Sequence, residues 1–423
     1  MATTNNLLKE EIVMFDDVLA GFEEALVYTQ QASNFTIGAV DGARSNDTVW
    51  RPMPMQADTY EGLDQTGNFG GKTEMAVPVT VNRLRSAPGS INSRELRDPR
   101  ILKRYGDAAK MKLASDVNNA LRRQAVYYGS VVDTRAGQAT GFDDVASMMA
   151  KFDSLGIPTD ERMANYSTRD FVKMASDLAS RQTLSGKTLT AYEKAYINDI
   201  AGFAIHSDAN AIMLPAATAT GSTIGAANQR YIPTATKKDA ISGDEHNVDN
   251  RSMLLTVAKT GGAWQVGDAF TIAGVYALHH ESKDSTGELK TFRIVEAVSD
   301  TSIRVVPALV AKDHATATQA ETAYANVSTT PANGAAITML NKNAAYANTM
   351  FNKGALELLP STLALDTKDG WATMQATLDN GLTLYYTRQG DINNLSTKYR
   401  WDIAFGTALL NPEMAGIQLF GQA

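Results

Sequence analysis

Apolar side chains between residues 7 and 28 recur at the spacing of a helix. The spacings of three and four join Ile12, Phe15, Leu19, Phe22 and Leu26. This period places the five side chains on one stripe and predicts an amphipathic helix, with acidic residues on its other faces. Two interpretations stay open: the stripe packs on the core of its own subunit, or it forms an arm that packs on a neighbouring subunit.

Two β-rich arms at residues 49–55 and 74–81 flank a polar, glycine-rich tip at residues 58–72. The pattern predicts a long two-stranded loop over residues 47–82. Prolines interrupt both arms, and proline in a sheet is confined to edges. Because an isolated hairpin is only marginally stable in water, we expect this loop either to move freely or to lie on another surface.

The clearest helix signal begins at Asp98 and Pro99 and runs to Gly129. Asp is a favoured N-cap residue, and Pro is favoured at the first helical position. A helix of about 30 residues is roughly 45 Å long. Its faces beside the apolar stripe are basic: Arg97, Arg100, Lys103, Arg104, Lys110, Lys112, Arg122 and Arg123. They indicate either a solvated surface or a contact to other subunits or nucleic acid.

The second half of the chain changes from helical to β patterns. Residues 142–214 are mixed, with helical spacings at Phe171, Met174 and Leu178 and again at Tyr192, Ala195 and Tyr196. Segments 215–236 and 315–336 are rich in Ala and Thr and are interpreted as linkers. Strands are predicted between them, at 253–257, 269–273, 291–298 and 302–306, and near the end of the chain, at 382–386, 401–405 and 416–420. We therefore predict an α+β chain with a compact β unit inserted into another domain.

Composition excludes several classes of protein. With 423 residues the chain has room for two or three domains, and its formal net charge of −7 argues against a dedicated nucleic-acid reader. Cysteine is absent, so there is no disulfide framework and no thiolate metal site. No stretch approaches the roughly 18 apolar residues of a membrane span. Acidic residues interrupt the N-terminal apolar positions, so we expect no signal peptide, no membrane partner and a soluble protein inside a cell.

Motifs of catalysis are weak or missing. Residues 185–188 resemble the end of a phosphate-binding loop, but Arg181 stands where that motif needs Gly. His279 and His280 on a strand would point to opposite faces, which suits a solvated strand end better than a metal site. Fingerprints of serine hydrolases, zinc proteases and dinucleotide-binding folds do not occur. We expect no catalytic residue, no cofactor and no metal, and a hydrolase is a remote alternative.

An acidic segment near residue 240 is the candidate for contacts between subunits. Asp239, Asp244, Glu245 and Asp249 lack the alternating spacing of a calcium-binding loop. The segment is interpreted as either a flexible solvated loop or a contact between subunits. The candidate contact residues are Lys237, Lys238, Asp239, Asp244, Glu245 and Arg251.

The order of these elements resembles the Hong Kong ninety-seven capsid fold, and the inserted β unit resembles that of the coat proteins of P-twenty-two-like podoviruses. Segments 45–52, 95–98, 248–251, 267–268, 272–275, 323–327, 389–392 and 411–413 carry the resemblance. It implies an N-terminal arm at 1–46, an extended loop at 47–82, a spine helix and peripheral domain at 83–145 completed by 385–423, an axial domain at 146–217 completed by 343–384, and an inserted β-barrel-like domain at 218–342.

The resemblance also implies a function. The protein would be a major capsid protein, not an enzyme, and would form an icosahedral shell of hexamers and pentamers around phage double-stranded DNA without sequence specificity. A scaffolding protein would guide a procapsid that expands, and a portal protein would occupy one vertex. Assembly would take place in the cytoplasm of the host bacterium, and the acidic segment would reach between capsomers. A cargo-storing compartment shell of the same fold is the alternative, and the insertion favours the phage.

Overall fold

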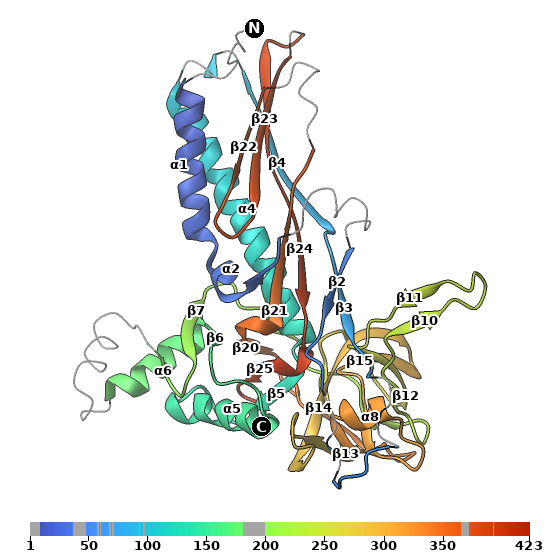
Figure 1. Ribbon diagram of the computed structural model, residues 1–423. Coiled ribbons are helices and arrows are strands. Elements are labelled where there is room, and N and C mark those ends of the chain that lie inside the picture. Colours follow the sequence, from blue (N-terminus) through green and yellow to red (C-terminus); the bar gives the residue numbers. More distant parts are fainter. Residues whose placement is uncertain are drawn as a thin grey trace. The chain divides into compact units, whose positions relative to one another are not determined.

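The computed structural model describes residues 9–36, 48–56, 59, 61–66, 69, 72–92, 94–95, 98–180, 199–364, 372–391 and 393–423. These residues fold into two compact units (Figure 1). The first comprises Met1–Val49, Val79–Arg122 and Glu357–Ala408, and the second comprises Trp50–Pro78, Arg123–Leu356 and Leu409–Ala423. The described residues form both helices and strands, which confirms the α+β class.

The first unit combines long helices with a sheet of long strands. Its helices are α1 (Lys9–Ala25), α2 (Val27–Gln31) and most of α4 (Pro99–Tyr128). Its sheet has the order β1-β21-β24-β23-β22, with β4 also paired to β24. The strands are β1 (Ser33–Asn34), β4 (Arg83–Asn92), β21 (Leu356–Ser361), β22 (Ala372–Thr377), β23 (Thr383–Asp391) and β24 (Ser396–Leu409). The predictions of the N-terminal helix and of the 30-residue helix are confirmed.

The apolar stripe of α1 packs on the core of its own unit. Phe15, Val18 and Phe22 are buried, and the Phe15 ring stacks on Trp401 of β24 with ring centroids 5.7 Å apart. The side-chain amide of Asn118 donates to the Ala25 carbonyl oxygen (2.8 Å), and its oxygen accepts from the Tyr28 backbone N–H (3.2 Å). The interpretation of a core-packed helix is therefore confirmed for the described residues, and Asn118 fixes the break between α1 and α2.

In the second unit, a mixed sheet has the order β5-β25-β20-β6-β7. Its strands are β5 (Val131–Thr134), β6 (Arg162–Ser167), β7 (Ala204–Asp208), β20 (Asn348–Asn352) and β25 (Ala415–Leu419). Helices α5 (Phe142–Leu155) and α6 (Thr168–Ser180) pack on it. The helix around Phe171 is confirmed as α6, whereas the one expected around Tyr192 lies outside the described residues.

The inserted β unit also belongs to the second unit and closes into a barrel. Its sheet order is β16-β17-β13-β14-β15-β12-β9, with β18 also paired to β13. The strands are β9 (Thr223–Ile224), β12 (Met253–Ala258), β13 (Ala269–Leu278), β14 (Ser285–Ser299), β15 (Ser302–Val306), β16 (Ala311–Asp313), β17 (Val327–Thr329) and β18 (Ile337–Met339). Thr223 bridges Ala336, and the Ile337 N–H donates to the Ser222 carbonyl, so β9 meets β18 and closes the ring.

The linker interpretation of the Ala/Thr-rich segments is wrong. Segment 215–236 supplies β9 and segment 315–336 supplies β17 and α8 (Gln319–Ala323), and Ile224 and Val327 are buried in the barrel core. Small side chains permit close approach of backbones: a Cβ at Gly262, where φ is +73°, would overlap the Thr218 carbonyl. Both segments therefore contribute ordered elements to the barrel.

A buried polar cluster joins the two ends of the insertion. The Asn341 amide donates to the Asp268 carboxylate (3.0 Å) and to the Pro215 carbonyl (3.1 Å), and its oxygen accepts from the Ala269 backbone N–H (3.1 Å). Arg293 donates to the Gly267 carbonyl (2.8 Å). Burial raises the pKa of Asp268 and lowers the pKa of Arg293 to about 10, because each loses hydration of its charge. We call Asp268, Arg293 and Asn341 the neck cluster.

No helix in the described part of the chain is long and apolar enough to cross a membrane.

The Phe15 stack yields a stability prediction. Phe15→Ala removes a buried ring from the surface of Trp401 and leaves a cavity, so we expect the free energy of unfolding of the monomer to fall by about 3–5 kcal/mol. Urea unfolding followed by circular dichroism measures it. Val13→Ala is the matched control on the same helix, since Val13 is 61% exposed, and should stay within about 0.5 kcal/mol. Equal, small effects of both changes would contradict packing of α1 on β24.

Candidate intersubunit surfaces and a buried ionic cluster

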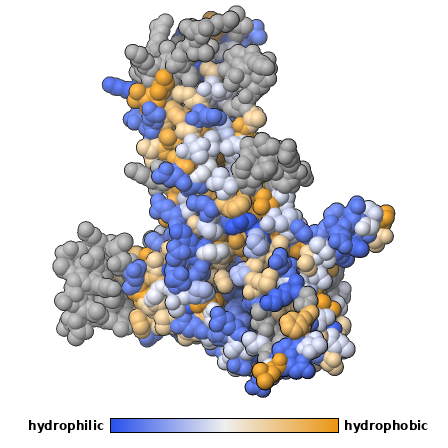
Figure 2. All heavy atoms as spheres, viewed as in Figure 1, coloured by the Kyte–Doolittle hydropathy of each residue, from blue (hydrophilic) through white to orange (hydrophobic). Residues whose placement is uncertain are grey.

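The acidic segment forms a hairpin that projects from the barrel (Figure 1). Strands β10 (Thr236–Lys238) and β11 (Glu245–Asn247) pair antiparallel, with Lys237 opposite His246 and Lys238 opposite Glu245. Residues 234–247 are all exposed. Figure 2 shows the projection as mostly hydrophilic, with hydrophobic atoms at its end. A hairpin that contributes nothing to the core of its own chain is free to contact another molecule.

Hydrogen bonds fix the conformation of the hairpin tip. The Asp239 carboxylate accepts from the backbone N–H groups of Ile241 (2.7 Å) and Ser242 (3.1 Å). The Asp239 N–H donates to the Asp244 carbonyl (2.9 Å), and the Gly243 N–H donates to the Asp239 carbonyl (3.1 Å). The two donors to its carboxylate lower the pKa of Asp239, so it stays ionised. These bonds favour an ordered tip over the alternative interpretation of a flexible loop.

The candidate contact residues divide into two groups. Lys237, Lys238, Asp239, Asp244 and Glu245 all lie on the hairpin; Lys238 Nζ and Glu245 Oε1 are 3.4 Å apart, with both side chains more than half exposed. Among the described residues, Lys237 and Asp244 form no ion pair. Arg251 lies apart, at the base of the hairpin.

The Arg251 guanidinium is occupied within its own chain. It pairs with Asp249 at 2.7 Å and donates to the Leu409 carbonyl (2.7 Å), and its side chain is only 14% exposed. A spacing of two residues across a turn lets the carboxylate and the guanidinium form two parallel hydrogen bonds. Five of the six candidates are therefore presented outward and one is not.

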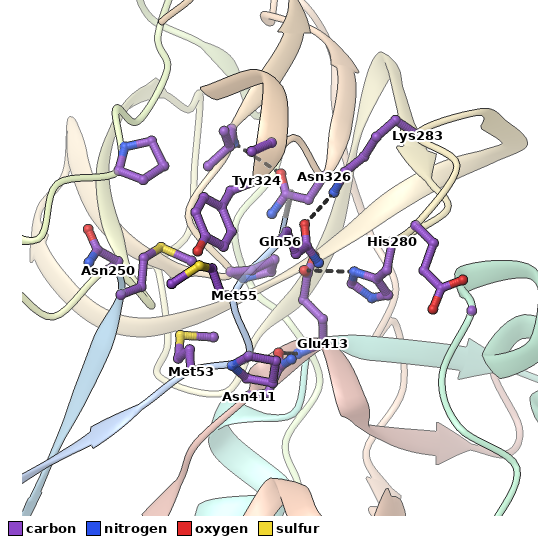
Figure 3. A pocket seen from close by; sticks show the side chains of 18 of the residues that line it. Met53, Met55, Gln56, Asn250, His280, Lys283, Tyr324, Asn326, Asn411 and Glu413 are labelled. Atoms are coloured by element: carbon purple, nitrogen blue, oxygen red, sulfur yellow. Dashed lines mark hydrogen bonds and ion pairs between the residues drawn. The ribbon is translucent and has the colours of Figure 1, made fainter. Parts of the chain in front are cut away.

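The outer parts of the long loop lie against the barrel of the same chain. Strands β2 (Thr48–Pro52) and β3 (Ala76–Thr80) form the expected pair. Beyond them, the Lys283 ammonium donates to the Gln56 side chain (2.6 Å) (Figure 3). The Tyr324 hydroxyl donates to the Thr73 carbonyl (2.9 Å). Of the two expectations for this loop, contact with another surface is the one that these described residues meet.

These contacts surround a cavity of about 640 Å³ in the second unit. Figure 3 shows its walls: Met53, Met55 and Gln56 come from the loop, Lys283, Tyr324 and Asn326 come from the barrel, and His280 and Glu413 are also labelled there. Methionine side chains adapt to irregular surfaces and leave the packing loose. The cavity therefore lies between the long loop and the barrel, which are joined by a few hydrogen bonds.

A buried ionic cluster lies at one wall of the cavity. Glu413, in the short helix η3 (Pro412–Met414), is in contact with Lys290 of β14, and its Oε2 is 3.7 Å from His280 Nδ1. Burial tends to raise the pKa of Glu413, but the Lys290 charge foremost, together with protonated His280 and Lys283, outweighs it and lowers that pKa. Burial is also the main cause that lowers the pKa of His280. The imidazole is neutral at pH 7, and the pair that carries charge is Lys290 and Glu413.

The expectation for the two histidines needs correction. They follow β13 in a turn instead of lying on the strand, and His280 is largely buried, not solvated: its backbone N–H donates to the Leu155 carbonyl (3.0 Å). Its Glu413 neighbour comes from a segment more than a hundred residues away in the sequence. No signal in the sequence pairs such distant residues, so this cluster was missed.

The cluster resembles an acid–base pair only in composition. Lys290 occupies the carboxylate that would orient the imidazole, and in the described part of the chain no hydroxyl is hydrogen bonded to His280. Groups of three or more His, Asp or Glu that could hold a metal do not occur among the described residues. Residues 185–188 lie outside those residues. The geometry gives the cluster a structural part in joining β14 to the C-terminal segment.

Comparisons with known proteins identify the family. A sequence model described as "P22 coat protein - gene protein 5" matches residues 1–421. The CUS-3 coat protein I-domain is 40% identical over 29% of this chain and 95% of its own, with a TM-score of 0.23. Capsid proteins of cyanophage P-SCSP1u (10% identity, 93% and 87% covered, TM-score 0.44) and bacteriophage PhiM1 (8%, 92% and 85%, 0.44) are similar over most of the chain.

The match over residues 1–421 decides between the two shell proteins that the sequence left open, because the family is one of phage coat proteins and not of compartment shells. It also confirms the Hong Kong ninety-seven-like capsid fold and the resemblance from which that fold was expected. The chain therefore belongs to the P22 coat protein family and is the major capsid protein that forms the shell of a phage virion.

Proposed function

We propose that this coat protein joins neighbouring capsomers of its shell through the β10–β11 hairpin. The observation that carries the proposal is the exposure of residues 234–247 on a projection whose tip is fixed by the Asp239 hydrogen bonds. A preordered surface loses little conformational freedom on binding. Each exposed ion pair contributes only about 0–1 kcal/mol, but a closed shell repeats the contact many times.

The distribution of charge favours a two-fold contact. Lys237 and Lys238 lie on strand β10 of the hairpin, Glu245 lies on the returning strand β11, and Asp244 directly precedes β11. A contact about a two-fold axis places the same surface on both partners, so lysines of one copy can meet acids of the other in both directions. Arg251 takes no part in this proposal, because its guanidinium is bound to Asp249 and Leu409.

Other parts of the proposal rest on family membership. We assign residues 1–46 to an N-terminal arm, 47–82 to an extended loop, 83–145 with 385–423 to the peripheral domain, 146–217 with 343–384 to the axial domain, and 218–342 to the inserted domain. The shell consists of hexamers and pentamers, assembles in the host cytoplasm with a scaffolding protein and a portal protein, and expands around double-stranded DNA.

Contact with the DNA is without sequence specificity. Exposed basic residues of α4 would meet phosphates, but several are already paired: Lys103 with Asp17 (2.9 Å) and Lys112 with Asp116 (3.2 Å). A surface of alternating sign attracts the backbone weakly and reads no bases. This agrees with a shell that must enclose its genome without gripping it.

We also propose that the chain is not an enzyme and that the His280–Glu413–Lys290 cluster is structural. The three side chains are largely buried, and Lys290 and Glu413 join β14 of the barrel to η3. Replacing one member leaves an unpaired charge in a buried site, which is strongly destabilising. A structural role therefore predicts effects on stability instead of turnover.

The hairpin proposal is tested by removing charge while keeping the tip bonded. Asp239→Asn, Asp244→Asn and Glu245→Gln retain side-chain oxygens and delete three charges. We expect the melting of the monomer to change by no more than about 0.5 kcal/mol. The yield of closed particles should fall, and assembly should become less sensitive to salt, because screening weakens exposed ion pairs. Negative-stain microscopy and light scattering across a salt series measure both.

The matched control neutralises three exposed acids elsewhere on the barrel, Glu288→Gln, Glu296→Gln and Asp300→Asn. It makes the same change in net charge and should assemble as the natural protein does. If the hairpin variant gives the same yield of closed particles and the same salt dependence as the natural protein, the hairpin is only a solvated projection.

The domain assignment predicts that residues 218–342 fold alone. The barrel closes on itself and has its own core, in which Phe270 and Phe292 stack with centroids 5.7 Å apart. The expressed fragment should give dispersed amide NMR signals and a cooperative melt, and the same fragment with Phe270→Ala should lose both. An undispersed spectrum of the unaltered fragment would show that the barrel depends on the rest of the chain.

The buried cluster predicts a loss of stability in mild acid. His280 and Glu413 both have lowered pKa values in the folded protein, so the unfolded chain binds more protons as pH falls below the unfolded histidine pKa of 6.5. Stability is therefore present above that pH and declines below it. His280→Gln should flatten the decline between pH 7.5 and about 5.5 in urea titrations, whereas His246→Gln on the exposed hairpin should not. Identical pH profiles for all three proteins would refute the assignment.

A further inference from the structure

We infer that Ile241, at the apex of the β10–β11 hairpin, is an apolar anchor that meets the Ile241 of a second copy of this chain across a two-fold axis. The inference rests on the proposed function of the hairpin and names the residue at the centre of that contact. It concerns a single side chain whose exposure has no explanation within the subunit.

Ile241 is 99% exposed, which sets it apart from the other large apolar residues on the surface of the barrel. Leu254, Val266 and Val298 are each about half exposed and lie along strands or beside them. Within residues 234–247 every other side chain is polar, charged or no larger than alanine. A complete isoleucine side chain in water is unfavourable, and its natural complement is a surface that removes it from water.

The tip is built so that Ile241 stays outward. Its own backbone N–H donates to the Asp239 carboxylate, and Gly243, with φ at +77°, completes the turn behind it. These interactions fix the backbone of the turn on which the Ile241 side chain is 99% exposed. An apolar residue presented on a fixed support and surrounded by charges has the composition of an interface centre with a polar rim.

A second copy is the partner because the shell is made of copies of this chain, and the hairpin carries both signs of charge. If a two-fold axis passes near the apex, Lys237 and Lys238 of one hairpin lie beside Asp244 and Glu245 of the other, and the reverse holds as well. A residue on the axis meets its own counterpart. Ile241 occupies that position. A charged residue there would be repelled by its identical counterpart, whereas two isoleucine side chains can pack together.

The absence of cysteine from the chain makes a direct test possible. In Ile241→Cys, the only disulfide that can form joins residue 241 of two copies, and it requires Cβ atoms about 3.5–4.5 Å apart. Particles assembled under reducing conditions are then oxidised and run on a non-reducing denaturing gel. We expect a dimer band from particles and none from dilute monomer. Val298→Cys, half exposed on the same barrel, is the matched control and should stay monomeric.

Assembled particles without the dimer band, or equal cross-linking of the Val298→Cys control, would overturn the apex contact. A second pair of variants applies if Ile241→Cys does not assemble. Ile241→Ser should lower the yield of closed particles by about tenfold or more, whereas Ile241→Leu should keep it. Equal yields from Ser and Leu would also overturn the inference. If Ile241→Ser assembles normally while the charge-neutralised hairpin variant does not, Ile241 is not an anchor of the contact. The proposed function of the hairpin would still hold.

Discussion

The neck cluster is the constraint on which the second unit depends. An insertion enters and leaves its host domain at one place, and the polar backbone groups of both crossings must be satisfied there without water. Asn341 does this by binding Pro215 at the entry and Asp268 and Ala269 at the base of the barrel. Arg293 lies fully buried beside Asp268, so removal of either would leave an uncompensated charge. Asn341 thereby ties the segment that enters the insertion at Pro215 to the start of barrel strand β13 at Ala269.

Period and capping made the regular elements predictable. The stripe of Phe15 and Phe22, the Asp98 and Pro99 start and the alternation in residues 253–306 are local signals that tertiary packing reinforced. Composition gave a wrong prediction for two segments rich in small residues, which form part of the barrel. The Ala- and Thr-rich composition of segments 215–236 and 315–336 predicts linkers, yet Ile224 and Val327 within them are buried in the barrel core.

The candidate surface was only partly predictable for a similar reason. A run of acids marks a solvated loop, but its charge says nothing of whether the loop is ordered; that depends on the Asp239 carboxylate facing the N–H groups of Ile241 and Ser242. Proximity in sequence places Arg251 with the hairpin, whereas in the fold its guanidinium binds Asp249 and the distant Leu409 carbonyl. Lys290 and Glu413 meet across 123 residues, beyond the reach of any local pattern.

The structure places its strong interactions within the subunit and its weak ones at the surface. In the second unit the buried barrel core, the neck cluster and the Lys290–Glu413 pair hold the chain together, whereas the hairpin offers a few exposed charges and one apolar side chain. Weak contacts let a misplaced neighbour dissociate before others trap it, and closure then makes the correct set collectively stable. Strengthening the hairpin contact would therefore slow the correction of errors before it improved the finished shell.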